Sequence, residues 1–379
     1  MDVRQIQVKS LQGANLASVQ EIAPGLVLVF GAVGLLDEPG VFDLLSTAFP
    51  GATLAGCSTA GEITAKGVSD GTCVVTAIRF DTVRHRVVDA AVPAMAASEG
   101  AGREVGRALA APDLAAILLF GKGVDVNGSA LIEGLMAEVG RAVPISGGLA
   151  GDGGSFTRTL TVTPSGILPD RVVAVGLYGD GLKIGHGSFG GWSAFGPPRK
   201  VTRSEGNVLY ELDGLPALDL YREYLGEYAK DLPASGLLFP FEMLDEGHAS
   251  VGLIRTILGV DDAKGALILA GDIDPTGYLR LMHASTDNLV DGAEAAARRI
   301  CDALGGEVGD GLGVLVSCVG RKLVMGDAVD EEVEAVAGVL GRSLKLTGFY
   351  SYGEIAPFSS TTDCKLHNQT MTVTFLGEH

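Results

Sequence analysis

The chain repeats one structural plan three times, and this repetition constrains its fold more than any other feature of the sequence. Each copy has a continuous apolar strand, an amphipathic helix and a glycine-rich loop that closes on an acidic residue. The strands are apolar on both faces, as strands of a buried sheet are. The sequence therefore predicts an α/β fold with mixed sheets built from repeated strand–helix–loop units. The three copies run over residues 26–63, 117–152 and 314–355.

Further helices and strands fill the intervals between these copies. Apolar residues at helical spacing, such as Leu131, Leu135 and Val139, predict the repeat helices. A further helix is expected to begin at Asp291 and to stop before Gly305. Pairs of apolar runs joined by short polar turns predict three β-hairpins. The runs are residues 73–80 with 85–92, 172–178 with 182–188, and 265–272 with 277–283.

The length of 379 residues is typical of two or three domains. A segment rich in glycine and proline at residues 196–216 is the expected boundary. We therefore expect an N-terminal domain over residues 1–200 and a C-terminal domain over residues 201–379, both built from related units.

The composition limits the kinds of binding partner and the cellular compartment that we expect for the chain. The net charge of −18 disfavours nucleic acid and anionic membranes as partners. The longest apolar stretch, residues 25–36, is shorter than the about 20 residues that span a bilayer, and the polar N-terminus lacks a signal-peptide core. Five widely spaced cysteines without a CxxC pair favour a reducing, cytoplasmic compartment.

Several motifs, in this order along the chain, resemble the FIST family of bacterial sensory modules. They include Gly56 to Gly61, Pro144 to Asp152, Ser317 to Arg321, Gly348 to Pro357 and Leu366 to Thr370. The resemblance covers nearly the whole chain and implies a sensor of small molecules such as amino acids. A standalone branch of the family binds haem, senses nitric oxide and signals through a separate histidine kinase or cyclic-di-GMP enzyme. Without a kinase or other output region, the sequence is similar to that standalone form.

The glycine-rich loops give the strongest indication of a ligand site. Loops at the carboxyl ends of strands gather around ligands in α/β sheets, and glycine lets backbone N–H groups approach the ligand. Glu62, Asp152 and Glu354 occupy comparable places in the three loops and are expected to receive a cationic group. The alternative is that the glycines make turns and that the acids are solvated or cap helices.

Individual side chains add candidates, each with a structural alternative. His186 lies between two glycines, which would leave room for a large flat ligand, and is the candidate axial ligand of haem iron. The alternative for each histidine is an ordinary structural role. Arg321 is expected to bind a carboxylate or, alternatively, a surface acid. The residues predicted to bind the ligand are Cys57, Ser58, Glu62, Asp152, His186, Trp192, Arg321, Tyr350, Tyr352, Glu354, His367 and Asn368.

Three functions remain open at this point. The first is a non-catalytic sensor that transmits ligand occupancy to a separate partner. The second is an acyl-transfer or hydrolytic enzyme with Cys57 as nucleophile, against the alternative that Cys57 is a small packed side chain. The third is an interaction scaffold without a ligand. No nucleotide-binding or metalloprotease motif is present, so those classes are unsupported.

Overall fold

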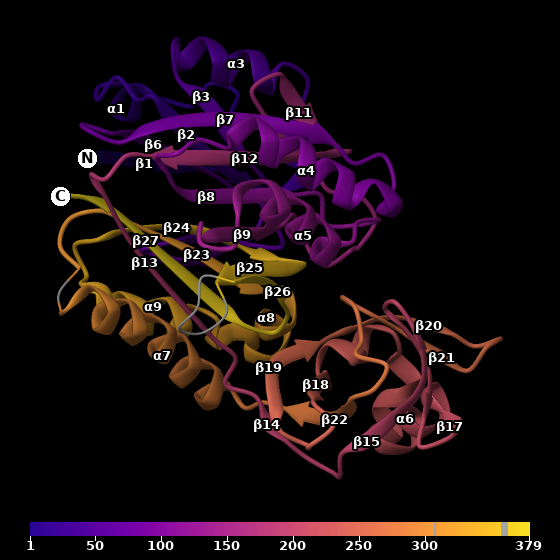
Figure 1. Cartoon of the computed structure of the whole chain (residues 1–379). Coiled ribbons are helices and arrows are strands. Elements are labelled where there is room, and N and C mark those ends of the chain that lie inside the picture. Colours follow the sequence, from indigo (N-terminus) through magenta and orange to yellow (C-terminus); the bar gives the residue numbers. More distant parts are fainter. Residues whose placement is uncertain (307, 358–362) are drawn as a thin grey trace.

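The computed structural model describes residues 1–306, 308–357 and 363–379. Three six-stranded sheets form the main body, and a fourth sheet lies in a separate lobe that Figure 1 shows at the lower right. The two chain ends lie close together, and the Met1 amino group approaches the Glu378 carboxylate at 2.9 Å. Among the described residues, no helix is long and apolar enough to cross a membrane.

The first sheet has the strand order β1-β6-β2-β3-β10-β11, in which β2 and β3 are parallel. Four of its strands come from residues 2–79, which contain the first repeat, and its hairpin directly follows the second repeat. Its strands are β1 (Asp2–Val8), β6 (Cys73–Arg79), β2 (Leu26–Gly31), β3 (Thr53–Ser58), β10 (Thr161–Thr163) and β11 (Gly166–Leu168).

The second sheet repeats this plan in the order β7-β12-β8-β9-β25-β26, with β8 and β9 parallel. Its hairpin comes from the third repeat. Its strands are β7 (Arg84–Ala91), β12 (Arg171–Tyr178), β8 (Leu114–Gly121), β9 (Ile145–Leu149), β25 (Gly353–Pro357) and β26 (Cys364–His367).

The third sheet has the order β13-β27-β23-β24-β4-β5, with β23 and β24 parallel. Its hairpin comes from the first repeat, so the three repeats exchange hairpins in a closed cycle. This exchange joins distant parts of the chain within every main sheet. Its strands are β13 (Leu182–Phe189), β27 (Met371–Glu378), β23 (Leu312–Cys318), β24 (Lys345–Ser351), β4 (Glu62–Thr64) and β5 (Gly67–Ser69).

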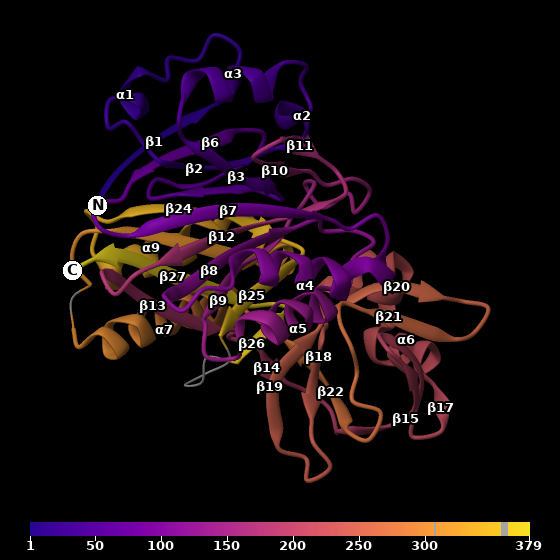
Figure 2. The same ribbon diagram turned by 45° about the horizontal axis from the view of Figure 1, so that its top comes forward.

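Helices cover the outer faces of these sheets (Figures 1 and 2). α1 and α3 pack on the first sheet, α4 and α5 on the second, and α7 and α9 on the third. The inner faces pack together in one apolar core. The helices are α1 (Ala17–Gln20), α2 (Val33–Leu36), α3 (Val41–Ala48), α4 (Ser98–Leu109), α5 (Gly128–Val139), α6 (Ala217–Leu225), α7 (Thr286–Leu304), α8 (Val319–Met325) and α9 (Asp330–Leu340).

The separate lobe is inserted between β13 and α7, two elements of the third sheet and its covering layer, and we call residues 193–283 the inserted subdomain. Its fourth sheet packs against α6 and the short 3₁₀ helices 226–231 and 234–237. Its strands are β14 (Ser193–Ala194), β15 (Arg199–Glu205), β16 (Val208–Leu212), β17 (Leu215–Pro216), β18 (Phe241–Leu244), β19 (Ser250–Arg255), β20 (Ile257–Asp261), β21 (Ala266–Leu269) and β22 (Tyr278–His283).

The mixed α/β fold with repeated units is confirmed, and the topology adds a relation that crosses the expected boundary at residue 200. β13, which precedes that boundary, pairs along its length with β27 at the C-terminal end. β4 likewise pairs with β24. The expected boundary region therefore leads into the inserted subdomain, while the three main sheets combine residues from both sides of it.

The three predicted hairpins are wrong, although their strands exist. β6 and β12 pair within their own sheets, and the chain then crosses to a neighbouring sheet as β7 and β13. β21 and β22 also lie apart in the fourth sheet. A short polar turn permits a crossover between packed sheets as readily as a hairpin, so turn chemistry alone did not distinguish them.

The boundary predicted for α7 also needs correction. α7 begins at Thr286, because the Ser285 side chain caps it by accepting a hydrogen bond from the backbone of Asn288. The C-terminal end follows the prediction, since Gly305 adopts the left-handed conformation (φ +80°) after the last helical residue.

One glycine in each repeat has a clear structural cause. Gly56, Gly147 and Gly348 lie in the second parallel strand of their repeats. A Cβ atom at these positions would lie 1.9, 2.0 and 1.8 Å from a carbonyl oxygen of the adjacent strand. The repeated glycine therefore permits close approach of two strands.

Candidate functional site

The three glycine-rich loops converge, and they contact one another directly. Three backbone hydrogen bonds form a cycle: Ala60 donates to Tyr350, Gly151 to Ser58, and Tyr352 to Leu149, at 2.8, 2.9 and 3.1 Å. Phe30, Phe120 and Phe349 pack together in the core, with centroid separations of 4.8–6.1 Å. The centre of the three-sheet body is therefore filled by side chains.

Two of the three predicted acids are buried in equivalent places. Glu62 accepts hydrogen bonds from Thr59 and from the backbone and hydroxyl of Thr72. Glu354 accepts from Ser351 and from both groups of Thr370. Burial raises the pKa of Glu62, and it raises the pKa of Glu354 to about 7. Both carboxyl groups therefore hold their own loops together.

The third predicted acid does not occupy the corresponding place. In the other two repeats, the glutamate immediately precedes the residue that pairs with the strand glycine. In the first sheet, Val162 pairs with Gly56, so the residue at the corresponding place is Thr161. Asp152 lies in extra residues before β10, where it accepts backbone hydrogen bonds from Phe156, Thr157 and Arg158. The sequence pattern matched Asp152 to this place because the intervening insertion was not recognised.

Cys57 and Ser58 lie inside the core. Both side chains are fully buried, and burial raises the pKa of the Cys57 thiol well above its ordinary value. The Ser58 hydroxyl donates to the carbonyl of Gly151 at 2.7 Å and accepts from the backbone of Leu160 at 2.8 Å. This geometry supports the alternative of a packed cysteine and gives no support to a thiolate nucleophile.

Arg321 and Tyr350 belong to a buried network whose central acid, Glu332, the sequence analysis missed. The Arg321 guanidinium donates to Glu332 at 2.7 and 3.1 Å and also to the carbonyl of Leu289. The Tyr350 and Ser317 hydroxyls donate to the same carboxylate. All these side chains are fully buried, so the surface ion pair is wrong for Arg321, while its binding of a ligand carboxylate stays a prediction.

His186 lies on β13, and its flanking glycines are occupied by helix packing. A Cβ on Gly185 would lie 2.7 Å from Ile300, and one on Gly187 would lie 1.8 Å from the carbonyl oxygen of Ala296. These glycines therefore admit α7, and the expected space for a flat ligand is absent there. His186 Nε2 is buried and has no hydrogen-bond partner within the described part of the chain, and burial lowers the pKa of the imidazole to about 4.

The environment of His186 does not fit a haem site at this position. Its side chain lines none of the three cavities at the loops and the inserted subdomain. Among the described residues, no group of three or more His, Cys, Asp or Glu is arranged to hold a metal ion. Binding of haem by the chain stays a prediction.

The glycine-rich loops of the first two repeats, together with α8 of the third, line an open cavity of about 570 Å³, which we call the loop cavity. Glu62 and Asp152 contribute to its wall, but their carboxylates are engaged within their own loops. Lys322 donates to Asp70 and to the carbonyl of Ala60. The charged groups of the loop cavity are thus largely engaged by the protein itself.

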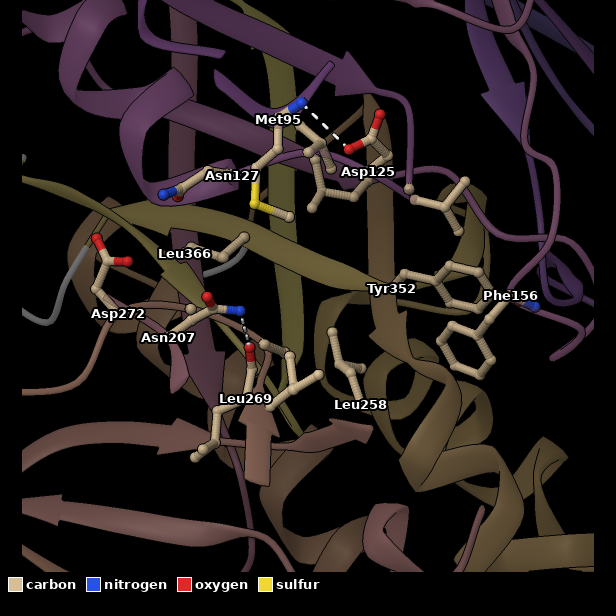
Figure 3. A pocket seen from close by; sticks show the side chains of 18 residues that line it. Met95, Asp125, Asn127, Phe156, Asn207, Leu258, Leu269, Asp272, Tyr352 and Leu366 are labelled. Carbon is tan, nitrogen blue, oxygen red and sulfur yellow. Dashed lines mark hydrogen bonds between the residues drawn. The ribbon is translucent and has the colours of Figure 1, made fainter. Parts of the chain in front are cut away.

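A more enclosed cavity of about 230 Å³ lies between the three-sheet body and the inserted subdomain, and we call it the subdomain cavity. The body supplies Tyr352, whose ring stacks on Phe156 with centroids 4.0 Å apart. The inserted subdomain supplies Leu258 and Asp272. Figure 3 shows the two stacked rings at one end of the cavity and Asp272 at the other.

The polar groups of the subdomain cavity are acceptors of hydrogen bonds. Asp125 accepts from the backbone of Met95 at 3.2 Å, and Asp272 makes no side-chain hydrogen bond with the described residues. Asn207 donates to the carbonyl of Leu269 at 2.8 Å, which leaves its side-chain oxygen as an acceptor. Among the described lining residues there is no Lys, Arg or His. The cavity combines apolar walls with two carboxylates whose cationic neighbours lie outside the lining: Asp125 pairs with Lys122 at 3.7 Å, and Asp272 interacts electrostatically with Arg255.

The remaining predicted residues lie on the other side of the inserted subdomain. Trp192 and His367 line a third cavity, of about 340 Å³, which we call the tryptophan cavity. Asn368, which follows His367 in the sequence, is buried, and its Oδ1 has no hydrogen-bond partner among the described residues. The predicted ligand residues therefore divide among three cavities and the core, and only Tyr352 lines the subdomain cavity.

The sequence analysis missed most of the subdomain cavity, including Asp125, Phe156, Asn207, Leu258 and Asp272. These residues come from loops and from the insertion, outside the repeated pattern. One local signal was present: Asn127 caps α5, with its Oδ1 accepting from the backbone of Ala130 at 3.0 Å. That cap places the preceding loop at the cavity.

Comparisons with known proteins identify relatives of the chain. An uncharacterized protein of Methanocaldococcus jannaschii is 39% identical over 92 residues, covering 23% of this chain and 17% of that protein. An uncharacterized protein of Mycobacterium tuberculosis is 31% identical over 176 residues, covering 44% of each. The chain thus spans less than half the length of these relatives.

Among solved structures, cyanuric acid hydrolase from A. caulinodans aligns with 100% of this chain and 98% of its own, at 10% identity and a TM-score of 0.39. A likeness at this level carries no functional argument.

Two domain families account for most of the sequence. Residues 25–215 match the FIST N domain, and residues 217–357 match the FIST C domain. The chain therefore belongs to the FIST family of sensory signal-transduction domains.

Proposed function

We propose that the chain is a non-catalytic sensor that binds a small molecule in the subdomain cavity. The observation that supports this proposal is that the cavity is built from two bodies, the three-sheet core and the inserted subdomain. A ligand there would contact both bodies at once. Pockets of this kind, apolar with a few placed polar groups, are typical of small-molecule sites.

The lining favours a ligand with an apolar body and a cationic end. Tyr352, Phe156 and Leu258 present apolar surface. Asp125 and Asp272 are the charged side chains of the lining, and their partners Lys122 and Arg255 do not line the cavity, so the surface that a ligand meets disfavours an anion. The volume of about 230 Å³ suits a metabolite better than a drug-sized molecule, whose pockets are about 300–1,000 Å³.

Ligand occupancy would be transmitted through the orientation of the inserted subdomain. A ligand shifts an equilibrium between two arrangements only to the extent that it binds one of them better. A ligand that contacts both walls would favour the arrangement in which the inserted subdomain lies against the three-sheet body. A separate partner would then recognise that arrangement, and a histidine kinase or a cyclic-di-GMP enzyme remains the predicted class.

Calorimetric titration with phenethylamine tests the proposal, with 2-phenylethanol as the uncharged analogue. We expect phenethylamine to bind and the alcohol to bind at least about tenfold more weakly, since about 1.4 kcal/mol corresponds to one factor of ten. Asp272→Asn should weaken phenethylamine by a similar factor, and Leu258→Trp should block the cavity. Asp291→Asn, at an exposed position of α7, is the matched control and should leave binding unchanged.

Equal affinity for the amine and the alcohol would contradict the assigned ligand class. If neither compound binds, or if Asp291→Asn weakens binding as much as Asp272→Asn, the subdomain cavity is not the sensory site.

A further inference from the structure

The tryptophan cavity lies where the chain leaves β13 and enters the inserted subdomain. Its wall combines that connection with β19, α7 and the turn between β26 and β27. Arg255 lies between the tryptophan cavity and the subdomain cavity. Ile254 lines the tryptophan cavity, while Leu366 and Asp272 line the subdomain cavity. Arg255 donates to the carbonyl oxygens of all three residues. The two cavities are therefore separate spaces.

Two aromatic side chains form flat walls of this cavity. Phe189 is 40% exposed, an unusual degree for a large apolar side chain. Trp192 is half-buried, and its indole N–H donates to the carbonyl of Gln369 at 2.8 Å, which fixes the ring. The neighbouring Gly190 and Gly191 leave the cavity floor without side chains. A planar ring is the shape that such walls accommodate best.

The charge of the tryptophan cavity differs from that of the subdomain cavity. The Glu242 carboxylate is neutralised by Arg280, at 2.6 and 3.1 Å. Burial lowers the pKa of His367 to about 4, so this imidazole is neutral at pH 7. Arg299 lies over the Phe189 ring at 5.3 Å, donates one hydrogen bond to the carbonyl of Ser188, and forms no ion pair among the described residues. A positive charge with unused donors thus remains.

We propose that the tryptophan cavity is a second binding site, which takes a small aromatic carboxylate. The carboxylate accepts hydrogen bonds from the Arg299 guanidinium, and the ring lies against Phe189 and Trp192. Arginine suits this role because its planar donors match both carboxylate oxygens. The site is independent of the subdomain cavity, with which it shares no lining residue and whose lining has no cationic side chain to receive a carboxylate.

The chain has a single tryptophan, so its intrinsic fluorescence reports on this cavity. Benzoate is the probe, with benzamide as the neutral analogue and benzylamine as the cation. We expect a saturable change of Trp192 fluorescence with benzoate and much weaker changes with the other two. The same titration by calorimetry gives an affinity independent of the fluorophore.

Two adjacent arginines on α7 provide a matched pair of variants. Arg298 and Arg299 are both exposed, but Arg298 pairs with Glu294 away from the cavity. Arg299→Gln should weaken benzoate about tenfold or more, because it removes the charged donor to the carboxylate. Arg298→Gln should leave the affinity unchanged.

Three outcomes would overturn the proposal. They are no saturable binding of benzoate, binding by calorimetry without a change in Trp192 fluorescence, and equal weakening by the two substitutions. Asp272→Asn should not affect benzoate, so failure of this site and failure of the subdomain cavity are distinguishable.

Discussion

The guanidinium of Arg255 donates a hydrogen bond of 3.3 Å to the carbonyl oxygen of Leu366. Arg255 ends β19 in the inserted subdomain, and Leu366 lies on β26 in the second main sheet. The guanidinium is buried, and burial lowers its pKa to about 10. A charged side chain held by carbonyl oxygens therefore links the inserted subdomain to the three-sheet body.

Arg255→Met should destabilise the protein and weaken phenethylamine binding. Methionine fills similar space but leaves three carbonyl acceptors without their donor, at a cost of about 1–3 kcal/mol for an unsatisfied buried group. Denaturant unfolding measures this loss. Arg222→Met is the control, because Arg222 pairs with Asp262 at the surface of the same subdomain and should cost less than about 1 kcal/mol. Equal losses in the two variants would contradict the linking role of Arg255.

Arg321→Met should reduce the free energy of unfolding by about 3–5 kcal/mol, because it leaves the Glu332 charge buried without its partner. The double variant Arg321→Met with Glu332→Gln should recover part of this loss. Denaturant titration of both variants provides the measurement. Unchanged stability of the single variant, with loss of ligand binding alone, would instead restore the predicted role of Arg321 as a ligand-binding residue.

Glu354 should make stability depend on pH between about 4.5 and 7. Its pKa rises from 4.5 to about 7 on folding because the carboxyl group is buried, so the folded state binds the proton more tightly. This contribution is present below pH 4.5 and is lost as the pH rises through 7; a shift of this size corresponds to about 3 kcal/mol. Glu354→Gln, compared with wild type by unfolding at pH 5 and pH 8, should be relatively more stable at pH 8. A constant difference would contradict this assignment.

Cys57 should resist alkylation in the folded protein, because its thiol is buried and its pKa is raised. Cys301 is partly exposed and should react first with iodoacetamide. Peptide mass spectrometry of the native protein distinguishes the two sites. Rapid modification of Cys57 with loss of an activity would revive the enzyme hypothesis.

The sequence predicted the helices and strands of each repeat better than it predicted which strands pair with one another. Apolar runs marked β2, β8 and β23 correctly, since burial on both faces leaves a local signature. The exchange of hairpins left no such signature, because β4 pairs with β24 across almost the whole chain. Pairing at such separation depends on how three sheets pack together, and no local pattern records it.

The site was harder to predict than the fold for a related reason. Glu62 and Glu354 stood out because they end glycine-rich loops, yet their carboxyl groups stabilise those loops. Asp272 and Leu258 form the subdomain cavity only because an insertion folds back on the second sheet. Neither residue belongs to a repeat, so repetition in the sequence directed attention away from them.

A distance measurement between the two bodies tests the central claim most directly. Spin labels at Glu104→Cys on α4 and Leu215→Cys in the inserted subdomain, both exposed positions, would report their separation in a Cys301→Ser background. We predict that phenethylamine narrows the distance distribution and shifts its mean, and that Asp272→Asn abolishes this effect. An unchanged distribution under conditions where calorimetry shows saturated binding would contradict the proposed sensory mechanism.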